Sequence, residues 1–227
     1  PNVLDPIDDT TVTYYNRVPS SFGRDLYRLT TPGHSGSTLY GIELTLQYEN
    51  RSFLFSGAAT AAITDTYANS HGYGPLENDQ TVIGELFTNP NAAVFAKGRS
   101  FNDRAFTGKI ATVAKLPGRT RLGAIARYQD GQNFARVLVF PNLNQGAEAV
   151  RAFANGDHRF MFVGTLDLRL QKTFGTGPRQ FDLFADGYNV LNLSYSVEEA
   201  MATLPDDRTP TVLQPPLSIQ VGARVRF

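Results

Sequence analysis

The chain has 227 residues, contains no cysteine, and balances 21 lysines and arginines against 21 aspartates and glutamates. A zero net charge argues against a nucleic-acid-binding protein, and the lack of cysteine excludes disulfides, thiolate nucleophiles and zinc–cysteine sites. The sequence has no run of about 18 apolar residues, the length that a membrane-spanning helix requires. Charged residues are few, at 19%, whereas glycine and aromatic residues are plentiful, so the composition favours an all-β protein with many turns.

The two halves of the chain differ in charge. Residues 1–96 carry 4 basic and 10 acidic side chains, whereas residues 97–227 carry 17 basic and 11 acidic ones. The chain starts at Pro1, without a methionine, a basic leader region or an apolar signal segment. We therefore expect a fragment of a longer protein or a processed chain.

Apolar and polar residues alternate along much of the chain, and this pattern is typical of β-strands with two different faces. The C-terminal segment is the clearest example. Its odd-numbered residues from Leu217 to Phe227 are apolar, and the even-numbered residues between them are polar or, at Gly222, small. In chain order, the alternation predicts an antiparallel meander of about eight strands, over residues 10–17, 39–49, 52–65, 103–116, 119–130, 160–174, 180–193 and 217–227.

Short and long connections alternate between these predicted strands. The short links contain glycine, proline or asparagine, which favour tight turns, and lie at residues 50–51, 117–118 and 175–178. The long links cover residues 18–37, 66–102, 131–159 and 194–214. In a meander, all short turns then lie at one end of the sheet and all long loops at the other, as in transmembrane β-barrels. A soluble β-sandwich or lipocalin-like barrel remains an alternative, because its strands alternate too.

The residue types on the two faces favour lipid over water on the apolar side. Several apolar faces end in aromatic residues, as expected at the two membrane–water interfaces, namely Tyr40, Tyr48, Tyr128, Phe162, Phe174 and Phe227. The opposite faces carry charges at mid-strand, among them Glu43, Lys109, Arg127, Asp167, Arg169 and Arg224. A water-filled barrel lumen would accommodate these charges.

A recognisable motif occupies the penultimate predicted strand. Residues 181–192 read Phe-Asp-Leu-Phe-Ala-Asp-Gly-Tyr-Asn-Val-Leu-Asn. Asp186, Asn189, Leu191 and Asn192 fit the pattern Asp-x-x-Asn-Leu-Leu-Asn, with Val190 in place of the first leucine. The segment and the alternating strand after it resemble the C-terminal end of TonB-dependent outer-membrane receptors.

Segments further upstream extend the resemblance over nearly the whole chain. Residues 40–44 are similar to the Tyr-x-Gly-x-Glu strand of these receptors, although the residue between tyrosine and glycine is missing. Four further segments resemble the Oar-like subgroup: Asn102-Asp103-Arg104, Leu116-Pro117-Gly118, Tyr128-Gln129-Asp130-Gly131 and Leu143-Asn144-Gln145-Gly146. Each motif is weak alone, but their order and spacing are fairly specific.

The resemblance implies that residues 1–227 form the C-terminal strands of a larger barrel of about 22 strands. No plug-like segment and no TonB box is recognisable, so the implied partners are the plug and remaining strands of a parent chain, and TonB through that chain. The implied location is the bacterial outer membrane, with its lipid around the barrel. The barrel-assembly machinery would read the C-terminal residues Ile219, Val221, Ala223, Val225 and Phe227. A complete eight-stranded outer-membrane barrel with a structural or adhesive role is the alternative.

Three groups of residues are candidates for binding. Asp5, Asp8 and Asp9 form a weak calcium candidate, because carboxylates cluster there without the glycine turn or distal glutamate of a calcium loop. A basic lumenal wall is expected from Arg121, Arg127, Arg169, Arg224 and Arg226, which would attract anionic ligands or pair with neighbouring carboxylates. Candidate ligand contacts in the long loop 66–102 are Tyr67, His71 and Tyr73.

No enzymatic role is expected. The segment Gly33-His34-Ser35-Gly36-Ser37 differs from a serine-nucleophile motif in its last position and precedes a strand instead of following one. The three histidines, His34, His71 and His158, are scattered, and no cofactor-binding pattern occurs. The sequence therefore predicts an outer-membrane barrel segment of a receptor or transporter, without catalytic residues, cofactor or nucleic-acid partner.

Overall fold

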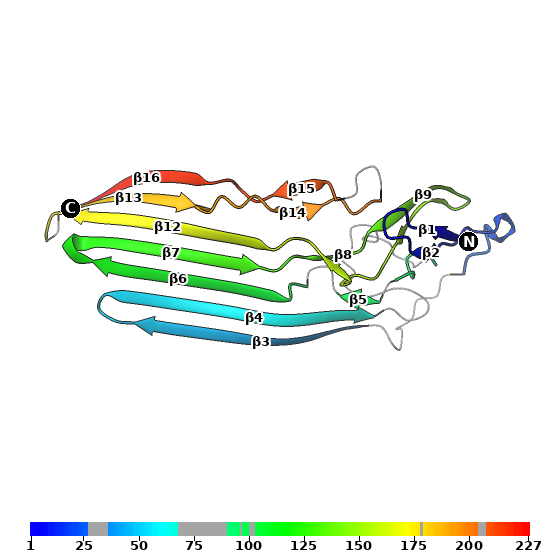
Figure 1. Cartoon of the computed structure of the whole chain (residues 1–227), viewed down its shortest axis with the longest axis horizontal. Helices are drawn as coiled ribbons and strands as arrows, with labels where there is room; N and C mark the ends of the chain where they lie inside the picture. Colours follow the sequence, from blue (N-terminus) through cyan, green and yellow to red (C-terminus); the bar gives the residue numbers. More distant parts are fainter. Residues whose placement is uncertain (27–35, 68–89, 96, 100–102, 178, 204–207) are drawn as a thin grey trace.

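A computed structural model describes residues 1–26, 36–67, 90–95, 97–99, 103–177, 179–203 and 208–227. Long antiparallel strands form one extended sheet in meander order (Figure 1). Seven long strands follow one another across it: Gly36–Glu49 (β3), Phe53–Tyr67 (β4), Phe106–Leu116 (β6), Thr120–Gln129 (β7), Val163–Phe174 (β12), Gln180–Tyr188 (β13) and Ser218–Arg226 (β16).

The all-β antiparallel meander expected from the sequence is confirmed, and seven of its predicted strands match these seven. The strand predicted over residues 10–17 is shorter than expected and does not belong to the sheet. Only Thr11–Thr13 (β2) is extended, and it pairs with Asn2–Leu4 (β1) in a hairpin apart from the sheet. A 3-10 helix at Pro19–Ser21 (η1) follows soon after. The sheet's eighth strand is instead the short Gly98–Arg99 (β5), which pairs with the end of β4.

Three tight connections join neighbouring long strands at one end of the sheet. Between β3 and β4, the Asn50 side chain accepts hydrogen bonds from the backbone N–H groups of Ser52 and Phe53, at 2.9 and 2.8 Å. Between β6 and β7, Pro117–Arg119 (η2) makes the turn, with Gly118 at a φ of 70° that glycine adopts without strain. We call this the short-turn end of the sheet.

The remaining short strands gather beyond the opposite end of the sheet (Figure 1). We call this group, with the segments that join its strands, the head. It contains β1, β2, Asn133–Phe134 (β8), Val137–Leu143 (β9), Gly146–Arg151 (β10), His158–Arg159 (β11), Ser196–Glu199 (β14) and Pro210–Leu213 (β15). The long links over 131–159 and 194–214 were expected as loops, but they form these paired strands from β8 to β15.

The buried hydrophobic side chains lie in the head. Phe134, Val137, Phe160 and Met201 form one cluster, and the Phe134 and Phe160 rings stack with centroids 4.7 Å apart. A second cluster joins the β1–β2 hairpin to β9 and β10 and consists of Val12, Leu138, Val150 and Ala152. The head therefore packs around its own core, and neither cluster includes a residue of the seven long strands.

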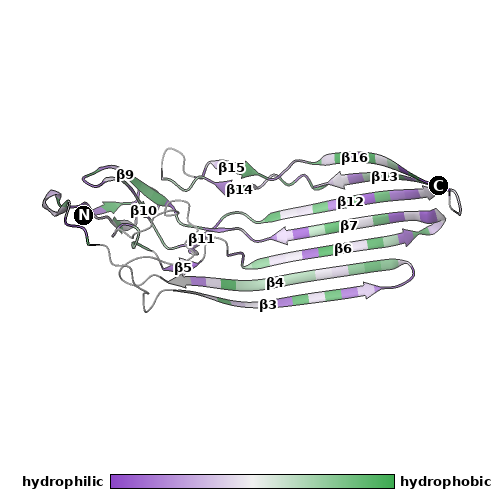
Figure 2. Ribbon diagram, turned by 180° about the vertical axis from the view of Figure 1, so that it is seen from behind, coloured by the Kyte–Doolittle hydropathy of each residue, from purple (hydrophilic) through white to green (hydrophobic). Residues whose placement is uncertain are grey.

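The register of the seven strands gives the sheet two different faces. Hydrophobic and hydrophilic residues alternate along several of the strands, most clearly along β3 (Figure 2). The apolar face carries Ile42, Leu44, Leu46, Ile110, Leu122, Leu168, Leu170, Leu183, Ile219 and Val221. The polar face carries Glu43, Lys109, Lys115, Arg121, Arg127, Asp167, Arg169, Asp182, Asp186, Arg224 and Arg226.

The apolar face is open to its surroundings. Ile42 and Leu44 on β3 each keep 67% of their area exposed, and Ile219 on β16 keeps 72%. Contiguous exposed apolar surface of this kind marks a contact with lipid or with another molecule. The sheet is thus a single layer whose hydrophobic side lacks a covering element among the described residues.

Candidate functional site: the polar face and the head

All five arginines predicted to form a basic wall lie on the polar face, but most of them have acidic neighbours. Arg127 pairs with Asp167, and Arg226 approaches Asp182 at 2.8 Å. Arg169 lies 3.6 Å from Asp186, its direct partner across β12 and β13. Arg224 faces Asp182 in the β13–β16 register, whereas Arg121 makes no ion pair with any described residue. Pairing with carboxylates therefore holds for Arg127, Arg169 and Arg226, whereas the attraction of anionic ligands stays a prediction.

The central ion pairs are held by their surroundings. The Arg169 guanidinium stacks over the Phe184 ring, 4.3 Å from its centroid, and the ring lies directly above Gly222. A side chain at Gly222 would collide with this ring, because an added Cβ would lie 2.4 Å from it. The absence of a Cβ at Gly222 thus lets Phe184 lie flat and support Arg169.

The motif residue Asn189 closes the end of β13 and helps to hold the polar face. Its backbone N–H donates to the Asp167 carboxylate at 3.0 Å. Its side-chain amide donates to the carbonyls of Leu193 and Pro215, at 2.9 and 2.8 Å. Asn189 has a φ of 48°, a left-handed conformation that asparagine tolerates better than most residues. The asparagine of the motif therefore has a structural role in this chain.

A hollow of about 340 Å³ lies on the polar face over Gly123. Its charged lining consists of the Arg127–Asp167 and Arg169–Asp186 pairs, and Tyr188 completes one side. Guanidinium groups bind carboxylates and phosphates through charge-assisted hydrogen bonds. In this hollow both guanidinium groups already have a carboxylate partner.

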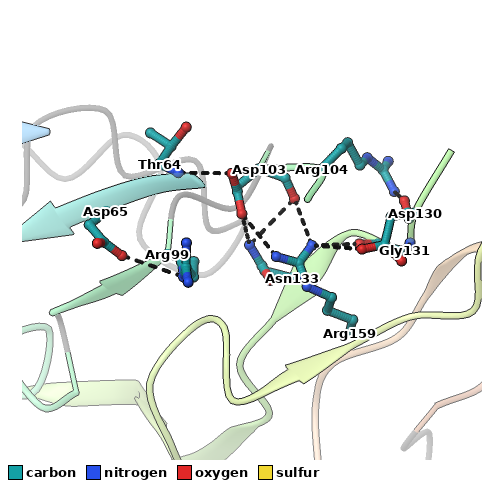
Figure 3. Close-up of polar contacts among 9 residues, drawn as sticks. All are labelled: Thr64, Asp65, Arg99, Asp103, Arg104, Asp130, Gly131, Asn133 and Arg159. Atoms are coloured by element: carbon teal, nitrogen blue, oxygen red, sulfur yellow. Dashed lines mark hydrogen bonds and ion pairs between the residues drawn. The ribbon is translucent and has the colours of Figure 1, made fainter. Parts of the chain in front are cut away.

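A buried carboxylate joins the sheet to the head at the other end. The Asp103 side chain is fully buried and accepts a hydrogen bond from the backbone N–H of Thr64 on β4 at 2.9 Å (Figure 3). The same carboxylate accepts from Asn133 at 3.2 Å and from Arg159 at 2.9 Å. Asp103 thus ties the end of β4 to β8 and β11.

Two further arginines make polar contacts nearby (Figure 3). Arg104 donates to the carbonyl of Asp130 at 3.1 Å and to the Gln132 side chain at 3.0 Å. Burial and, next, repulsion from Arg159 lower the pKa of Arg104 below its usual range. Arg99 on β5 lies beside Asp65 of β4, with 3.4 Å between Nε and the carboxylate. Arg104 thus joins the start of the β6 segment to the segment that leads into β8, and Arg99 joins β5 to β4.

The weak calcium candidate has a different partner in this structure. Arg136 at the start of the β9 region donates to Asp5 at 2.5 Å and also to Asp8. Burial opposes the charge on Arg136, but its hydrogen bonds to Asp5 and Asp8 outweigh burial and raise its pKa. Asp9 has a φ of 54° in the turn between β1 and β2. In the described part of the chain, no three histidine, aspartate or glutamate side chains are grouped as metal ligands.

Two of the three candidate ligand contacts, His71 and Tyr73, lie outside the described residues. Tyr67 is the last residue of β4, and only its backbone is described. The ligand role of this loop therefore stays a prediction.

The five residues of the expected assembly signal lie along the C-terminal edge of the sheet. Ile219, Val221, Ala223 and Val225 are on the apolar face of β16, and Phe227 follows it with 96% of its area exposed. Among the described strands, β16 pairs only with β13. Its other backbone edge is therefore available to a further strand.

Comparison with known proteins adds no relative. No protein-family model, no curated protein and no solved structure matches this chain. Within the described residues, no helix has both the length and the apolar character needed to cross a membrane. The resemblance to TonB-dependent receptors stays a prediction.

The sequence analysis missed the residues that hold the head together. Asp103, Arg159 and Asn133 form the buried network, and Arg136 joins the N-terminal hairpin to β9. The partners Asp5 and Arg136 are 131 positions apart, so no local spacing could indicate their contact. The only available signal was the Asn102-Asp103-Arg104 motif, which indicated a resemblance without a role.

Proposed function

We propose that this chain forms part of the wall of an outer-membrane β-barrel that acts as a receptor or transporter. The observation that carries the proposal is the open apolar face, to which all seven long strands contribute. In water this face would expose a large hydrophobic surface, whereas lipid would cover it. The polar face would then line a hydrated lumen, where its ion pairs are stable.

The dimensions of the apolar face fit a bilayer. Tyr40 and Tyr48 bound the apolar stretch of β3, which is nine residues long, and a tilted strand needs about 9–11 residues to cross a membrane. Outer-membrane barrels have an apolar band about 25 Å tall, flanked by aromatic residues at both interfaces. Other aromatic residues of this face lie near the head, at Phe106 and Tyr128, and near the short-turn end, at Phe55, Phe174 and Phe181.

The strand directions exclude an antiparallel barrel made of the seven long strands alone. Each step of the path from β3 to β16 is antiparallel, so these two edge strands run in the same direction. Closing the sheet by pairing β3 with β16 would create a parallel pair. An antiparallel barrel instead needs an odd number of further long strands between the two edges.

Within this class, we propose a TonB-dependent receptor of the Oar-like subgroup. The motif from Asp186 to Asn192 supports this, together with the order of the upstream motifs. The head would face outward and capture a ligand, and TonB would drive its release through a plug in the parent chain. This segment would contribute wall, ligand-binding head and assembly signal, and no catalytic residue.

The absence of tryptophan allows a direct test of the membrane proposal, because one introduced tryptophan reports alone. Ile110 and Ala111 are neighbours at the same depth on β6, on the apolar and polar faces respectively. In liposomes of lipids brominated at mid-chain, we expect strong quenching of Ile110→Trp and little quenching of Ala111→Trp. Equal quenching of both variants, or a wild-type chain that stays monomeric in buffer without detergent, would refute membrane insertion.

The TonB-dependent part has its own test. The reading frame that leads into Pro1 must encode a plug domain and the strands that complete the barrel. An upstream region without a plug would exclude this part of the proposal and leave a barrel without TonB-driven transport.

A further inference from the structure

A strongly basic pocket lies at the short-turn end of the polar face. Lys115, Arg119, Arg121 and Arg226 line it, together with Gln171, Thr173 and Gln180. Its volume is about 290 Å³, and none of its lining residues is acidic. The pocket therefore collects positive charge without a carboxylate in its own wall.

The strand register places like charges opposite each other at this pocket. Lys115 on β6 is the direct partner of Arg121 on β7. Like charges in direct cross-strand opposition destabilise a sheet. Neither side chain forms an ion pair with any residue in the described ranges, in contrast to Arg127 and Arg169 further along the face. This repulsion would be relieved by an anionic group bound between them.

Asp182, the carboxylate that contacts Arg226 of the pocket, is already engaged. Asp182 binds Arg226 at 2.8 Å, accepts the Thr173 hydroxyl at 2.7 Å, and faces Arg224 in the register. Asp182 therefore balances at most one of the two β16 arginines, and Lys115 and Arg121 keep their charge uncompensated.

The β6–β7 turn beside the pocket is held by two hydrogen bonds. Arg119 donates to the carbonyl of Gly175, and the Lys172 ammonium donates to the carbonyl of Gly118 at 2.6 Å. The first bond joins this turn to the β12–β13 turn, and the second joins it to the end of β12. The turn that carries Arg119 is thus held in place next to the basic residues of the pocket.

We propose that this pocket and the adjacent β16 arginines bind an acidic, extended polypeptide segment that reaches the polar face from the short-turn side. The inference rests on the proposed function, which makes the polar face a lumen. From β6 to β16 the basic residues cross four strand spacings, or about 19 Å. A single small anion cannot span this width, whereas about six residues of extended chain can.

The test uses the full chain in detergent micelles and a fluorescein-labelled hexaglutamate peptide as probe, with hexaglutamine as the uncharged control. We expect hexaglutamate to bind and hexaglutamine not to bind. In the double variant Lys115→Gln, Arg121→Gln, affinity should fall about tenfold, because two ion pairs are lost. The matched control is Arg51→Gln, an exposed cation at the same end of the sheet but outside the pocket, and it should change affinity less than about twofold.

Two outcomes would overturn the inference. One is equal affinity of the double variant and the wild type. The other is displacement of the peptide by inorganic phosphate at equal concentration, which would assign the pocket to a small anion. The substitutions remove a repulsive pair, so we expect the variant to fold. Salt gives an independent test with the wild type, since its affinity for hexaglutamate should fall steeply between about 0.05 M and 0.5 M NaCl.

The inference and the proposed function can fail separately. A chain that inserts into liposomes but does not bind hexaglutamate would retain the barrel proposal and refute the acidic partner. A chain that binds hexaglutamate but does not insert would refute the barrel, and with it the lumenal location of the site.

Discussion

Replacing Asp103 with asparagine removes one negative charge from the junction of sheet and head while keeping the shape of the side chain. The carboxylate accepts hydrogen bonds from Thr64, Asn133 and Arg159, and its side chain is fully buried. The asparagine oxygen can still accept from Thr64. Its amide group, however, would point N–H donors at the donors of Asn133 or Arg159.

The loss of stability that Asp103→Asn causes at the junction follows from these contacts. A hydrogen bond to a charged group contributes about 1.5–3 kcal/mol, and a buried unpaired donor adds a desolvation penalty. Arg159 keeps its bond to the Gly131 carbonyl at 3.0 Å and is 24% exposed, so part of the loss is recovered from solvent. We therefore expect Asp103→Asn to destabilise the junction by about 2 kcal/mol, or about 30-fold in its opening equilibrium.

Amide hydrogen exchange measures this directly, because the Thr64 N–H is itself bonded to Asp103. Exchange at Thr64 and in the head should accelerate about 30-fold in detergent micelles, while amides at the centre of the sheet keep their protection. The matched control is Asp157→Asn, which removes an exposed carboxylate from the same head. A change below about threefold at Thr64, or an equal change in the control, would refute the role of Asp103 as the joining residue.

Three further predictions address the head and the orientation of the chain. Arg136→Gln leaves the buried Asp5 carboxylate without its cation and should destabilise the packing of the N-terminal hairpin by about 3 kcal/mol, measured as faster proteolysis there. Adding Asp5→Asn should recover part of this loss, and strictly additive effects of the two substitutions would contradict the pairing. Gly131→Ala should lower the free energy of unfolding by about 3 kcal/mol or more, measured by thermal unfolding, because its Cβ would lie 1.7 Å from the Phe160 carbonyl oxygen. The control Gly108→Ala, whose Cβ would have its nearest neighbour at 4.0 Å, should be nearly neutral, and equal costs of the two variants would contradict this packing. Because the chain has no cysteine, a membrane-impermeant maleimide should label Asp157→Cys but not Thr176→Cys in intact cells, and labelling of Thr176→Cys alone would reverse the proposed orientation.

The strands could be predicted because their signal is local. Each of the seven matched strands carries its own alternation, so neighbouring positions suffice to find it. The ends are less predictable, as β13 illustrates. It was expected to reach residue 193 but stops at Tyr188, because Asn189 turns the chain with a φ of 48° and binds carbonyls on two other segments.

Of the candidate site, the polar face could be predicted from the sequence, whereas the head could not. Alternation alone assigned Arg121 and Arg169 to one face, and the register places them there. The head could not be predicted, because its contacts join residues that are distant in sequence and its longest strand, β9, lacks alternation. The run Val137–Phe140 is continuously apolar, and its strand pairs with Ala149, Val150 and Arg151, where the chain folds back.

The ion pairs on the polar face have a consequence for how the strands find their partners. If β12 slipped by one residue against β7, Arg169 would move to the apolar face, where, in the proposed barrel, an arginine at the bilayer centre would cost about 2–4 kcal/mol. A slip of two residues would keep the faces but separate Arg127 from Asp167. The ion pair between β7 and β12 therefore helps to select their alignment during assembly, because the observed register keeps Arg127 and Asp167 paired on the polar face.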